Sequence, residues 1–336
     1  MTGIPTAGST DLGDRPDLFE AARVRPGGFV FGGAGSPLPF REAGGSRAAA
    51  AGFSPARGFP LNYPPMPKIH PSAIVEKSVQ LHESVEIGPW CHVSGNVQLG
   101  AGVRLVGNVY IQGPVTVGEG TVIYPFACIG FEPQDVKFKP GMPTGGVQIG
   151  VNCMIREHVT IHCATKPDVP TTVGDRAFMM VNSHIGHDGR IGNDVTMVNA
   201  SVIGGHAQIA DRVLLGGNSA IHQFVRVGRL AMIGGDSSSS LDVPPFLVGA
   251  NRNNLAGINL IGMRRSGMDR NDITAVREAY RSVFKPGLMR EQMLARLAEL
   301  GKGSPAVMEM HEFVRTAKRP LLAHASSRDL SGGEQA

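Results

Sequence analysis

The sequence has few aromatic residues, few cysteines, no long apolar run and no cluster of like charges. Phe, Trp and Tyr make up 6% of its 336 residues, and no apolar stretch is long enough for a transmembrane helix. The formal charge of +4 is spread along the chain, which argues against a nucleic-acid partner. We interpret the four cysteines as free thiols in a reducing cytoplasm.

The chain is rich in glycine, with 45 residues, and carries a repeat with a period of six. Apolar residues occupy every sixth position from Ile69 to Ile129, and again in the same phase from Val173 to Ile233. This period fits neither an amphipathic helix nor a lone strand. It predicts a mainly β fold, the parallel β-helix of hexapeptide-repeat proteins. Three hexapeptides form one triangular coil, so positions 18 apart should stack.

Two interruptions and two flanking segments divide the chain. The repeat breaks after Ile129, up to about residue 146, and again from Cys163 to about Thr171. We expect a catalytic β-helix domain at 66–262 with these two inserted loops, since insertions in solenoids often build the binding site. Residues 1–65 and 324–336 lack a periodic pattern and are expected to be disordered. Translation starting at Met66, or a dispensable tail, would explain the first segment.

Residues 263–323 are expected to form a small helical domain that covers the open end of the prism. Asp269 is a candidate cap for a helix that ends near Pro286. A second helix is expected from Leu288 to Gly301, and Ser304 followed by Pro305 favours the start of a third.

Several histidines follow stacked repeat positions and should therefore gather in space. His187, His206 and His222 follow Ile185, Ile203 and Ile221, which are 18 residues apart. His162 joins them if the second insertion adds about six residues. Neighbouring strands lie about 4.8 Å apart, so we expect these side chains within roughly 5 to 10 Å of one another.

Asp188 follows His187 directly, and this pair is the strongest candidate for catalysis. A carboxylate bonded to one imidazole nitrogen fixes the tautomer and leaves the other nitrogen as a base. No Ser or Cys nucleophile motif accompanies the pair, which favours direct proton abstraction from a substrate hydroxyl. A zinc site is the competing interpretation, because histidines on adjacent coils can converge on a metal. We expect neither metal nor cofactor.

Six short motifs carry a resemblance to a known family. They are P-Q-D-V-K at 133–137, V-T-I-H at 159–162, S-H-I-G-H-D at 183–188, G-G-H at 204–206, I-H-Q-F at 221–224 and D-V-P-P at 242–245. Together they resemble the UDP-N-acetylglucosamine 3-O-acyltransferase family, the acyl-carrier-protein-dependent first enzymes of lipid A synthesis. The resemblance covers roughly residues 67 to 320.

The resemblance implies a cytoplasmic homotrimer of left-handed β-helices with three active sites in the clefts between prisms. Its substrates would be a (3R)-3-hydroxyacyl group on acyl carrier protein and UDP-N-acetylglucosamine. By motif position, His187 would be the general base and Asp188 its orienting partner, and Gly235 would set acyl-chain length. The substrate contacts would come from Asp135, Lys137, His162, His184, His206 and Gln223.

The segment after Asn259 departs from the family pattern. The resemblance implies that Asn259, Arg264 and Arg265 meet the nucleotide, and two arginines suffice to pair with a diphosphate. Ile261, however, stands where the family has an acidic residue, so a modified acceptor is conceivable. Other sugar N- or O-acyltransferases, a γ-class carbonic anhydrase and a non-catalytic trimeric scaffold are the alternatives.

Overall fold

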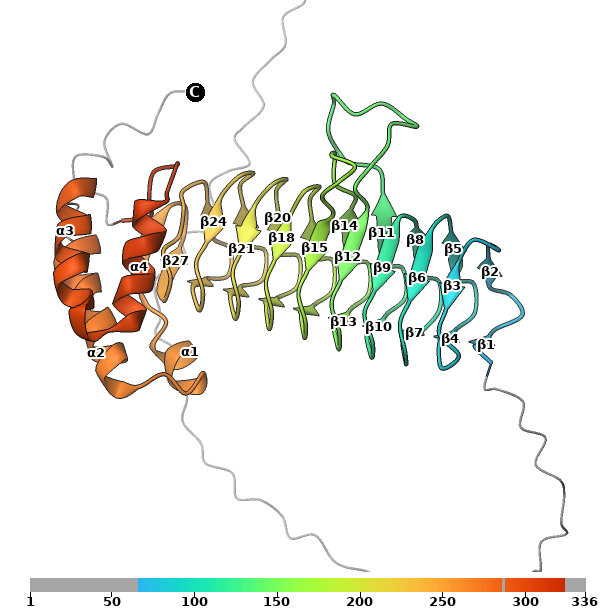
Figure 1. The fold of residues 1–336 in the computed structure, drawn as a ribbon, viewed down its shortest axis with the longest axis horizontal. Helices are drawn as coiled ribbons and strands as arrows, with labels where there is room; N and C mark the ends of the chain where they lie inside the picture. The colour runs from blue at the N-terminus through green and yellow to red at the C-terminus, as the bar shows by residue number, and fades with distance from the viewer. Residues whose placement is uncertain (1–65, 286–287, 324–336) are drawn as a thin grey trace, which may run out of the picture. The chain divides into compact units, whose positions relative to one another are not determined.

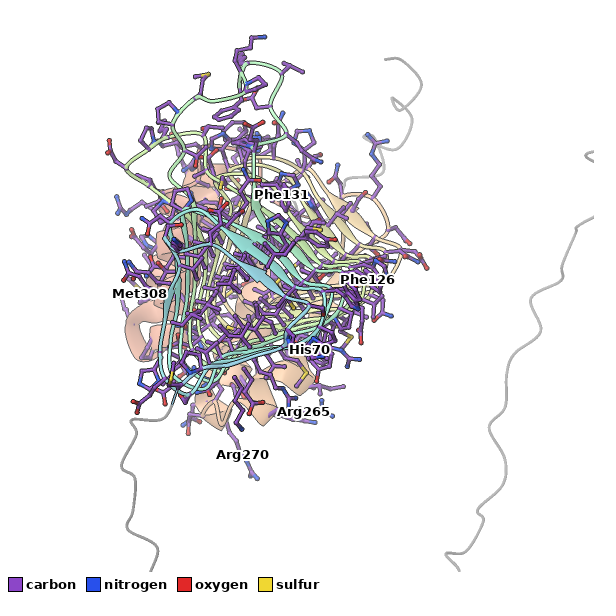
Figure 2. The ribbon with its side chains drawn as sticks, turned by 90° about the vertical axis from the view of Figure 1, so that its right-hand side faces the viewer. His70, Phe126, Phe131, Arg265, Arg270 and Met308 are labelled. Atoms are coloured by element: carbon purple, nitrogen blue, oxygen red, sulfur yellow. The ribbon has the colours of Figure 1, made fainter. Side chains whose placement is uncertain are left out.

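The computed structural model of the protein describes residues 66–285 and 288–323, so the disorder expected for 1–65 and 324–336 lies outside the described residues. From β1 to β26, consecutive strands of the described part belong to three different sheets in rotation (Figure 1). The chain therefore winds as a parallel β-helix, with the three sheets as the faces of a prism. Figure 2 looks along the stack of coils and shows Phe126, Phe131 and Arg265 on separate sides of it.

We name the three sheets faces A, B and C. Face A consists of β1 (Lys68–Ile69), β4 (Glu86–Ile87), β7 (Arg104–Leu105), β10 (Val122–Ile123), β13 (Met154–Ile155), β16 (Phe178–Met179), β19 (Thr196–Met197), β22 (Leu214–Leu215), β25 (Met232–Ile233), β27 (Leu247–Ala250) and β28 (Asn254–Ile258). Face B consists of β2 (Ile74–Val75), β5 (His92–Ser94), β8 (Tyr110–Gln112), β11 (Cys128–Phe131), β14 (Thr160–His162), β17 (His184–Ile185), β20 (Val202–Ile203), β23 (Ala220–Ile221) and β26 (Ser238–Ser239). Face C consists of β3 (Gln80–Leu81), β6 (Val97–Leu99), β9 (Val115–Val117), β12 (Val147–Ile149), β15 (Thr171–Val173), β18 (Arg190–Ile191), β21 (Gln208–Ile209) and β24 (Arg226–Val227).

The repeated apolar residues fill the prism, as the period predicts. On face B, Ile161 pairs with Ile185, Ile185 with Ile203 and Ile203 with Ile221, and all four are buried. Fully burying one such side chain is worth about 1.5 to 3 kcal/mol, so the stack supplies much of the stability. Ile69, in the first coil, is 43% exposed because no coil covers it on that side.

Most corners of the prism turn through a residue in the left-handed backbone region. Between faces B and C these residues are Asp188, His206 and Phe224, with φ of 59°, 60° and 65°. Such angles are uncommon outside glycine, and the recurrence at 18-residue spacing shows that the coil geometry imposes them. We call this row of corners the B–C edge. The C–A edge carries Asp194, Arg212 and Leu230 in the same way.

The two interruptions of the repeat are loops, as predicted. The first connects β11 to β12 and the second connects β14 to β15, and both project from the same side of the prism (Figure 1). They touch each other, because the Gly145 N–H donates to the Ala164 carbonyl and the Ala164 N–H donates to the Gly146 carbonyl. In the register of face C, Val115 pairs with Val147 and Val147 with Thr171, so the second loop adds the expected six residues.

The C-terminal helices also follow the sequence signals. Asp269 caps α2 (Arg270–Ala279), which continues as a π-helical turn, η1 (Tyr280–Phe284), and Ser304 caps α4 (Pro305–Arg315). Between them lie α3 (Arg290–Leu300) and a 3-10 turn, η2 (Gly301–Gly303). A short helix that the sequence did not indicate, α1 (Leu260–Arg265), spans the boundary expected between residues 262 and 263.

Two arginines of the prism hold α4 in place. Arg226 bonds the buried Asp242 at 3.0 Å and donates to the Phe313 carbonyl, while Arg229 pairs with Glu309 at 2.6 Å. The helices thus pack on the last coils through long-range polar contacts. Within the described residues, none of the helices combines the length and apolarity needed to cross a membrane.

Candidate active site

The candidate site lies on face B and the B–C edge, beside the two inserted loops. His162 and His184 occupy adjacent strands, β14 and β17, with ring centroids 5.5 Å apart. His162 donates from Nδ1 to the Glu132 carbonyl of the first loop at 2.6 Å, and His184 shares a hydrogen bond of 2.7 Å with Thr160. The loop and the neighbouring strand therefore fix both rings.

His187 and Asp188 form the hydrogen-bonded pair that their adjacency predicts. His187 Nδ1 lies 2.7 Å from Asp188 Oδ2, and both side chains are largely buried. The carboxylate can only accept from this nitrogen, so Nδ1 carries a proton and Nε2 is the nitrogen left for other contacts. Among the described residues, Nε2 has no hydrogen-bond partner. The left-handed backbone at Asp188 turns its side chain toward its neighbour instead of to the opposite face.

Thr165, in the second loop, completes the surroundings of Asp188. Its backbone N–H and its hydroxyl both donate to the carboxylate, the hydroxyl at 2.9 Å. Burial alone would raise the pKa of Asp188, but the hydrogen bonds from His187 and Thr165 outweigh it and keep the pKa below its usual value. Asp188 is therefore a carboxylate at neutral pH.

His206 stands one coil further along the B–C edge. Its ring is perpendicular to that of His187, with centroids 5.1 Å apart, and it stacks on Phe224 at 4.5 Å. Its Nε2 lies 3.6 Å from Asp188 Oδ2. Burial lowers the pKa of His206, and the negative charge of Asp188 only partly opposes this effect.

The surroundings of His184 favour its neutral form. Burial, together with the nearby His162 and His187 rings, lowers the pKa of His184 to about 4. A second proton on the His184 ring would place a positive charge in a poorly solvated site. At neutral pH, His184 can therefore offer a neutral hydrogen-bonding group to a ligand.

The first loop brings Asp135 toward this cluster, with Lys137 two residues further along the loop. The Lys137 N–H donates to Asp135 Oδ1 at 2.9 Å, which forms a tight turn, and the charge of Asp135 acts on His206. Gln223 lies on the same B–C edge, two coils beyond His187, and its side chain is exposed. Next to it, His222 is exposed and bonds the Gln223 carbonyl through Nδ1.

The remaining candidates lie on other sides of the same chain. Gly235 follows β25 at the corner between faces A and B, where an added β-carbon would touch only the Gly217 carbonyl, at 3.5 Å. Arg265 lines a cleft with Arg212 and Asp194 at the C–A edge, and Arg264 is exposed on the same helix. Asn259 caps α1: it accepts from the Gly262 N–H and donates to the Leu230 carbonyl.

Sequence reasoning missed three residues that shape the site. Phe224 could have been found, since it lies 18 positions after His206 and must stack on it. Thr160 lies 24 residues before His184, which is one coil of 18 residues plus the six inserted ones, so this spacing could have predicted that they stack. Nothing in the sequence pointed to Thr165, because it lies in an inserted loop and the six-residue period does not extend through the loop.

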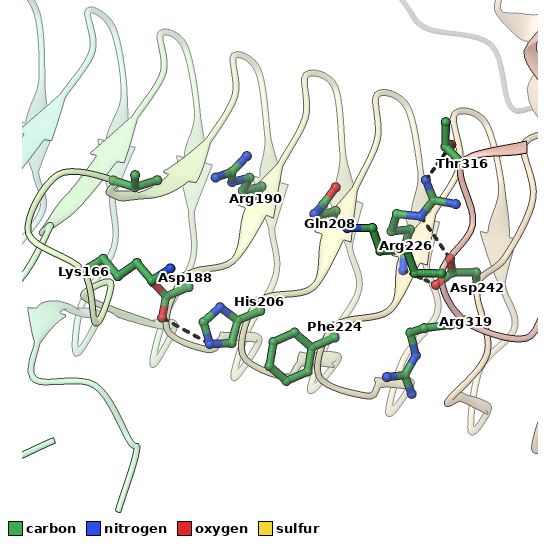
Figure 3. Close-up of a pocket in the computed structure, with 12 residues that line it drawn as sticks. Lys166, Asp188, Arg190, His206, Gln208, Phe224, Arg226, Asp242, Thr316 and Arg319 are labelled. Carbon is green, nitrogen blue, oxygen red and sulfur yellow. Dashed lines mark hydrogen bonds and ion pairs between the residues drawn. The ribbon is translucent and has the colours of Figure 1, made fainter. Parts of the chain in front are cut away.

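A concave cleft opens beside the pair. It has a volume of 530 Å³ and its walls include Asp188, His206 and Phe224 on one side and outward residues of face C on the other (Figure 3). The cleft therefore reaches Asp188 and His206, and a concave space lined by polar groups is the kind of place where a ligand binds.

The pair and His206 could also present three donor atoms to a metal, since these atoms lie within 4.8 Å of one another. A metal between His187 Nδ1 and Asp188 would replace their direct 2.7 Å hydrogen bond. In the structure, His187 Nδ1 and the Asp188 carboxylate are instead bonded directly to each other.

Comparisons with known proteins agree with this fold and identify the family. Residues 242–322 match a family model described as UDP N-acetylglucosamine O-acyltransferase, domain 2. An acyl-[acyl-carrier-protein]–UDP-N-acetylglucosamine O-acyltransferase of Rhizobium johnstonii is 44% identical over 257 residues, which are 76% of this chain and 94% of that protein.

Solved structures extend the match to the fold. The UDP-N-acetylglucosamine acyltransferase of Francisella novicida superimposes with a TM-score of 0.74 at 32% identity, over 80% of this chain and 99% of that one. The Moraxella catarrhalis enzyme gives 0.72 at 37% identity, over 76% and 99%. Both confirm the left-handed parallel β-helix with C-terminal helices. The chain therefore belongs to the acyl-[acyl-carrier-protein]–UDP-N-acetylglucosamine O-acyltransferase family and is an acyltransferase.

Proposed function

We propose that this enzyme moves a (3R)-3-hydroxyacyl group from acyl carrier protein to the 3-hydroxyl of UDP-N-acetylglucosamine, the first step of lipid A synthesis. The names of its relatives support both substrates. The six motifs that carry the resemblance all lie along the B–C edge, in the two loops or next to them, or in the coil that closes the prism.

In the proposed mechanism His187 acts as general base in a direct attack. Nε2 takes the proton of the sugar 3-hydroxyl as its oxygen bonds to the thioester carbonyl carbon. The tetrahedral intermediate then expels the carrier's thiolate, which receives the proton from the imidazolium. The 2.7 Å hydrogen bond between His187 Nδ1 and Asp188 is the observation that carries this proposal. General-base catalysis of this kind is worth about 10² to 10⁴ in rate.

Asp188 would hold the ring in the productive tautomer and stabilise the imidazolium that forms. It is suited to this task because Thr165 and the coil geometry fix its position. The six substrate contacts implied by motif position remain part of the proposal: Asp135, Lys137, His162, His184, His206 and Gln223.

The separation of the predicted residues within one chain supports a trimer with shared sites. The base lies on the B–C edge, whereas Arg265 lies at the C–A edge. If neighbouring prisms meet through faces A and B, the C–A edge of one chain can approach the B–C edge of the next. A single prism could not bring these two groups to one substrate.

The outward side chains agree with this arrangement. From β10 onward, face A presents uncharged residues: Val122, Met154, Phe178, Thr196, Leu214, Met232 and Val248. The corner between faces A and B exposes Trp90 by 66% and Phe126 by 49%. Face C carries Arg190, Gln208 and Arg226 instead. Aromatic and apolar faces favour burial against a partner, and the polar face favours solvent.

Arg264, Arg265 and Asn259 are proposed to meet the nucleotide of the acceptor. Asn259 is engaged by α1, so its contribution would be to hold the helix that presents the two arginines. Ile261 is 64% exposed in this segment and offers no hydrogen bond to a hydroxyl. We therefore include a modified sugar in the assay panel.

A panel assay tests the proposal. Purified enzyme is given 3-hydroxyacyl thioesters of acyl carrier protein with UDP-N-acetylglucosamine, its 3-amino analogue or UDP-glucose. We expect turnover with an N-acetylated UDP-sugar, and products acylated at position 3. Acetyl-CoA is included as a further donor, and transfer only from acetyl-CoA would favour a different sugar acyltransferase. No transfer with any pair would contradict the proposed substrates.

The three-atom cluster is the one observation that favours a zinc enzyme of the carbonic anhydrase type. Metal analysis and CO₂ hydration separate it from the proposal. We expect chelator-treated enzyme to keep its full acyltransferase rate. Stoichiometric zinc together with CO₂ hydration would contradict the base mechanism.

A further inference from the structure

The cleft beside the pair carries more positive charge than the proposed base chemistry uses. Its walls hold five cationic side chains and two carboxylates, Asp188 and Asp242. The cations are Lys166, Arg190, Arg226, Lys318 and Arg319. Both carboxylates are already satisfied, Asp188 by His187 and Asp242 by Arg226.

Four of these cations have no carboxylate partner among residues 66–285 and 288–323. Lys166, Arg190 and Lys318 point exposed side chains along the cleft. Arg319 donates from one terminal nitrogen to the Ser240 carbonyl at 3.1 Å, while its Nε is buried without a hydrogen-bond partner. Unpaired cations in a concave site attract an anion and hold it more firmly than a flat surface would.

The backbone holds Arg319 firmly at one end of the cleft. Asp242 donates from its N–H to the Pro320 carbonyl at 3.0 Å, and the Leu322 N–H donates to the Asp242 carbonyl at 2.8 Å. The segment after α4 is thereby bridged to the last turn of the prism. A ligand at Arg319 would meet a preformed site, which lowers the cost of binding.

The length of the cleft limits the kind of anion. Asp188, His206 and Phe224 stand in a row on successive coils, with Arg319 beyond them (Figure 3). Coils are about 4.8 Å apart, so an anion at Arg319 lies roughly 15 Å from the base. In a UDP-sugar only the sugar ring separates the hydroxyl from the diphosphate. An acyl carrier protein instead holds its thioester at the end of an extended arm that begins with a phosphodiester.

We propose that Arg319 and Lys318 bind this phosphodiester and that the arm lies along the row of His206 and Phe224 toward His187. The inference rests on the proposed function, because it assigns the donor of that reaction to the cleft. Lys166 and Arg190 add to the potential that draws the carrier in.

The test replaces Arg319 by Gln and, separately, Lys318 by Gln. Each variant should raise the KM for the acyl carrier protein donor by about tenfold, the usual scale for one hydrogen bond to a charged group. The KM for UDP-N-acetylglucosamine should not change. With an N-acetylcysteamine thioester, which lacks the phosphate, variants and wild type should perform alike.

Arg315→Gln is the matched control, since Arg315 ends α4 just before this segment but already pairs with Glu312 at 2.6 Å. It should leave both KM values unchanged. Melting curves show whether Arg319→Gln folds; if it does not, Lys318→Gln, whose side chain has no partner in the described structure, decides alone.

Three results would overturn the inference: an unchanged donor KM in both variants, an equal loss with the phosphate-free donor, or a rise confined to the KM of the UDP-sugar. The last would assign the cleft to the nucleotide. Absence of turnover by the wild-type enzyme with every carrier thioester is a separate result, which would contradict the proposed function itself.

Discussion

Gly205 leaves no room for a side chain beside His187. A β-carbon at position 205 would lie 2.6 Å from His187 Nε2, the nitrogen proposed as the base. The coil that follows the pair thus closes directly over the imidazole. The backbone φ of Gly205 is one that any residue can adopt. The need for glycine at this position therefore comes from the contact with His187 and not from the backbone.

Gly205→Ala should therefore displace the ring without unfolding the protein. We expect kcat to fall between about tenfold and a hundredfold, the scale of a misplacement of about 1 Å, with little change in melting temperature. Gly257→Ala is the control, since an added β-carbon there meets nothing within 4 Å. Full activity in Gly205→Ala would mean that the ring is free to move or is not the base.

The pKa of His184 predicts how stability depends on pH. Its folded value of about 4 lies below the ordinary 6.5, so the unfolded chain binds more protons between these values. Stability from this group is complete above about pH 6.5 and is lost as the pH falls toward 4. In His184→Gln, the urea concentration at the midpoint of unfolding should change less with pH between about 4 and 6.5 than in the wild type. An identical pH profile in wild type and variant would show that another group dominates.

Three stacked serines inside the prism are positions where we expect replacement by alanine to stabilise the protein. The hydroxyls of Ser183, Ser201 and Ser219 are buried without a hydrogen-bond partner in the described residues. Alanine already fills the corresponding inward position at Ala207 and Ala231. Ser201→Ala should raise the free energy of unfolding by about 1 kcal/mol, measured by urea denaturation.

Ser237→Ala is the contrasting substitution at the next stacked position. Its hydroxyl donates to the Gly235 carbonyl at 3.0 Å and accepts from the Asn251 N–H at 2.9 Å. This change should destabilise the protein by about 1 kcal/mol. Equal effects of the two substitutions would mean that the stacked hydroxyls are all equally satisfied.

Gly235→Met tests where the acyl chain lies. Space is open beside Gly235, so a Met side chain can project from the surface without backbone strain. If the acyl groove passes there, the preference should shift to shorter donors by about 1 to 3 kcal/mol in relative kcat/KM. Gly303→Met, on the helical side, should leave the donor profile as it is. An unchanged profile in Gly235→Met would place the groove elsewhere.

The sequence predicted the prism and the histidine cluster because both follow from one period. Stacking at 18-residue spacing placed His187 and His206 on one edge, and adjacency paired Asp188 with His187. The sequence did not show Thr165 or the contact of Arg226 with α4, because these join loop or helix residues to a coil far away in the chain. Helix α1 was missed because six residues are too few for a periodic signal.

The identity of the base is tested most directly by comparing single-turnover rates of His187→Ala, His184→Ala and His162→Ala, each confirmed to be folded by its melting curve. We expect His187→Ala to lose about 10² to 10⁴ in rate at saturating substrates, and Asp188→Ala to lose less, because it removes orientation but not the base. His184→Ala and His162→Ala should act mainly on KM. A near-normal rate for His187→Ala, together with loss of activity in either of the other two histidine variants, would contradict the proposed mechanism.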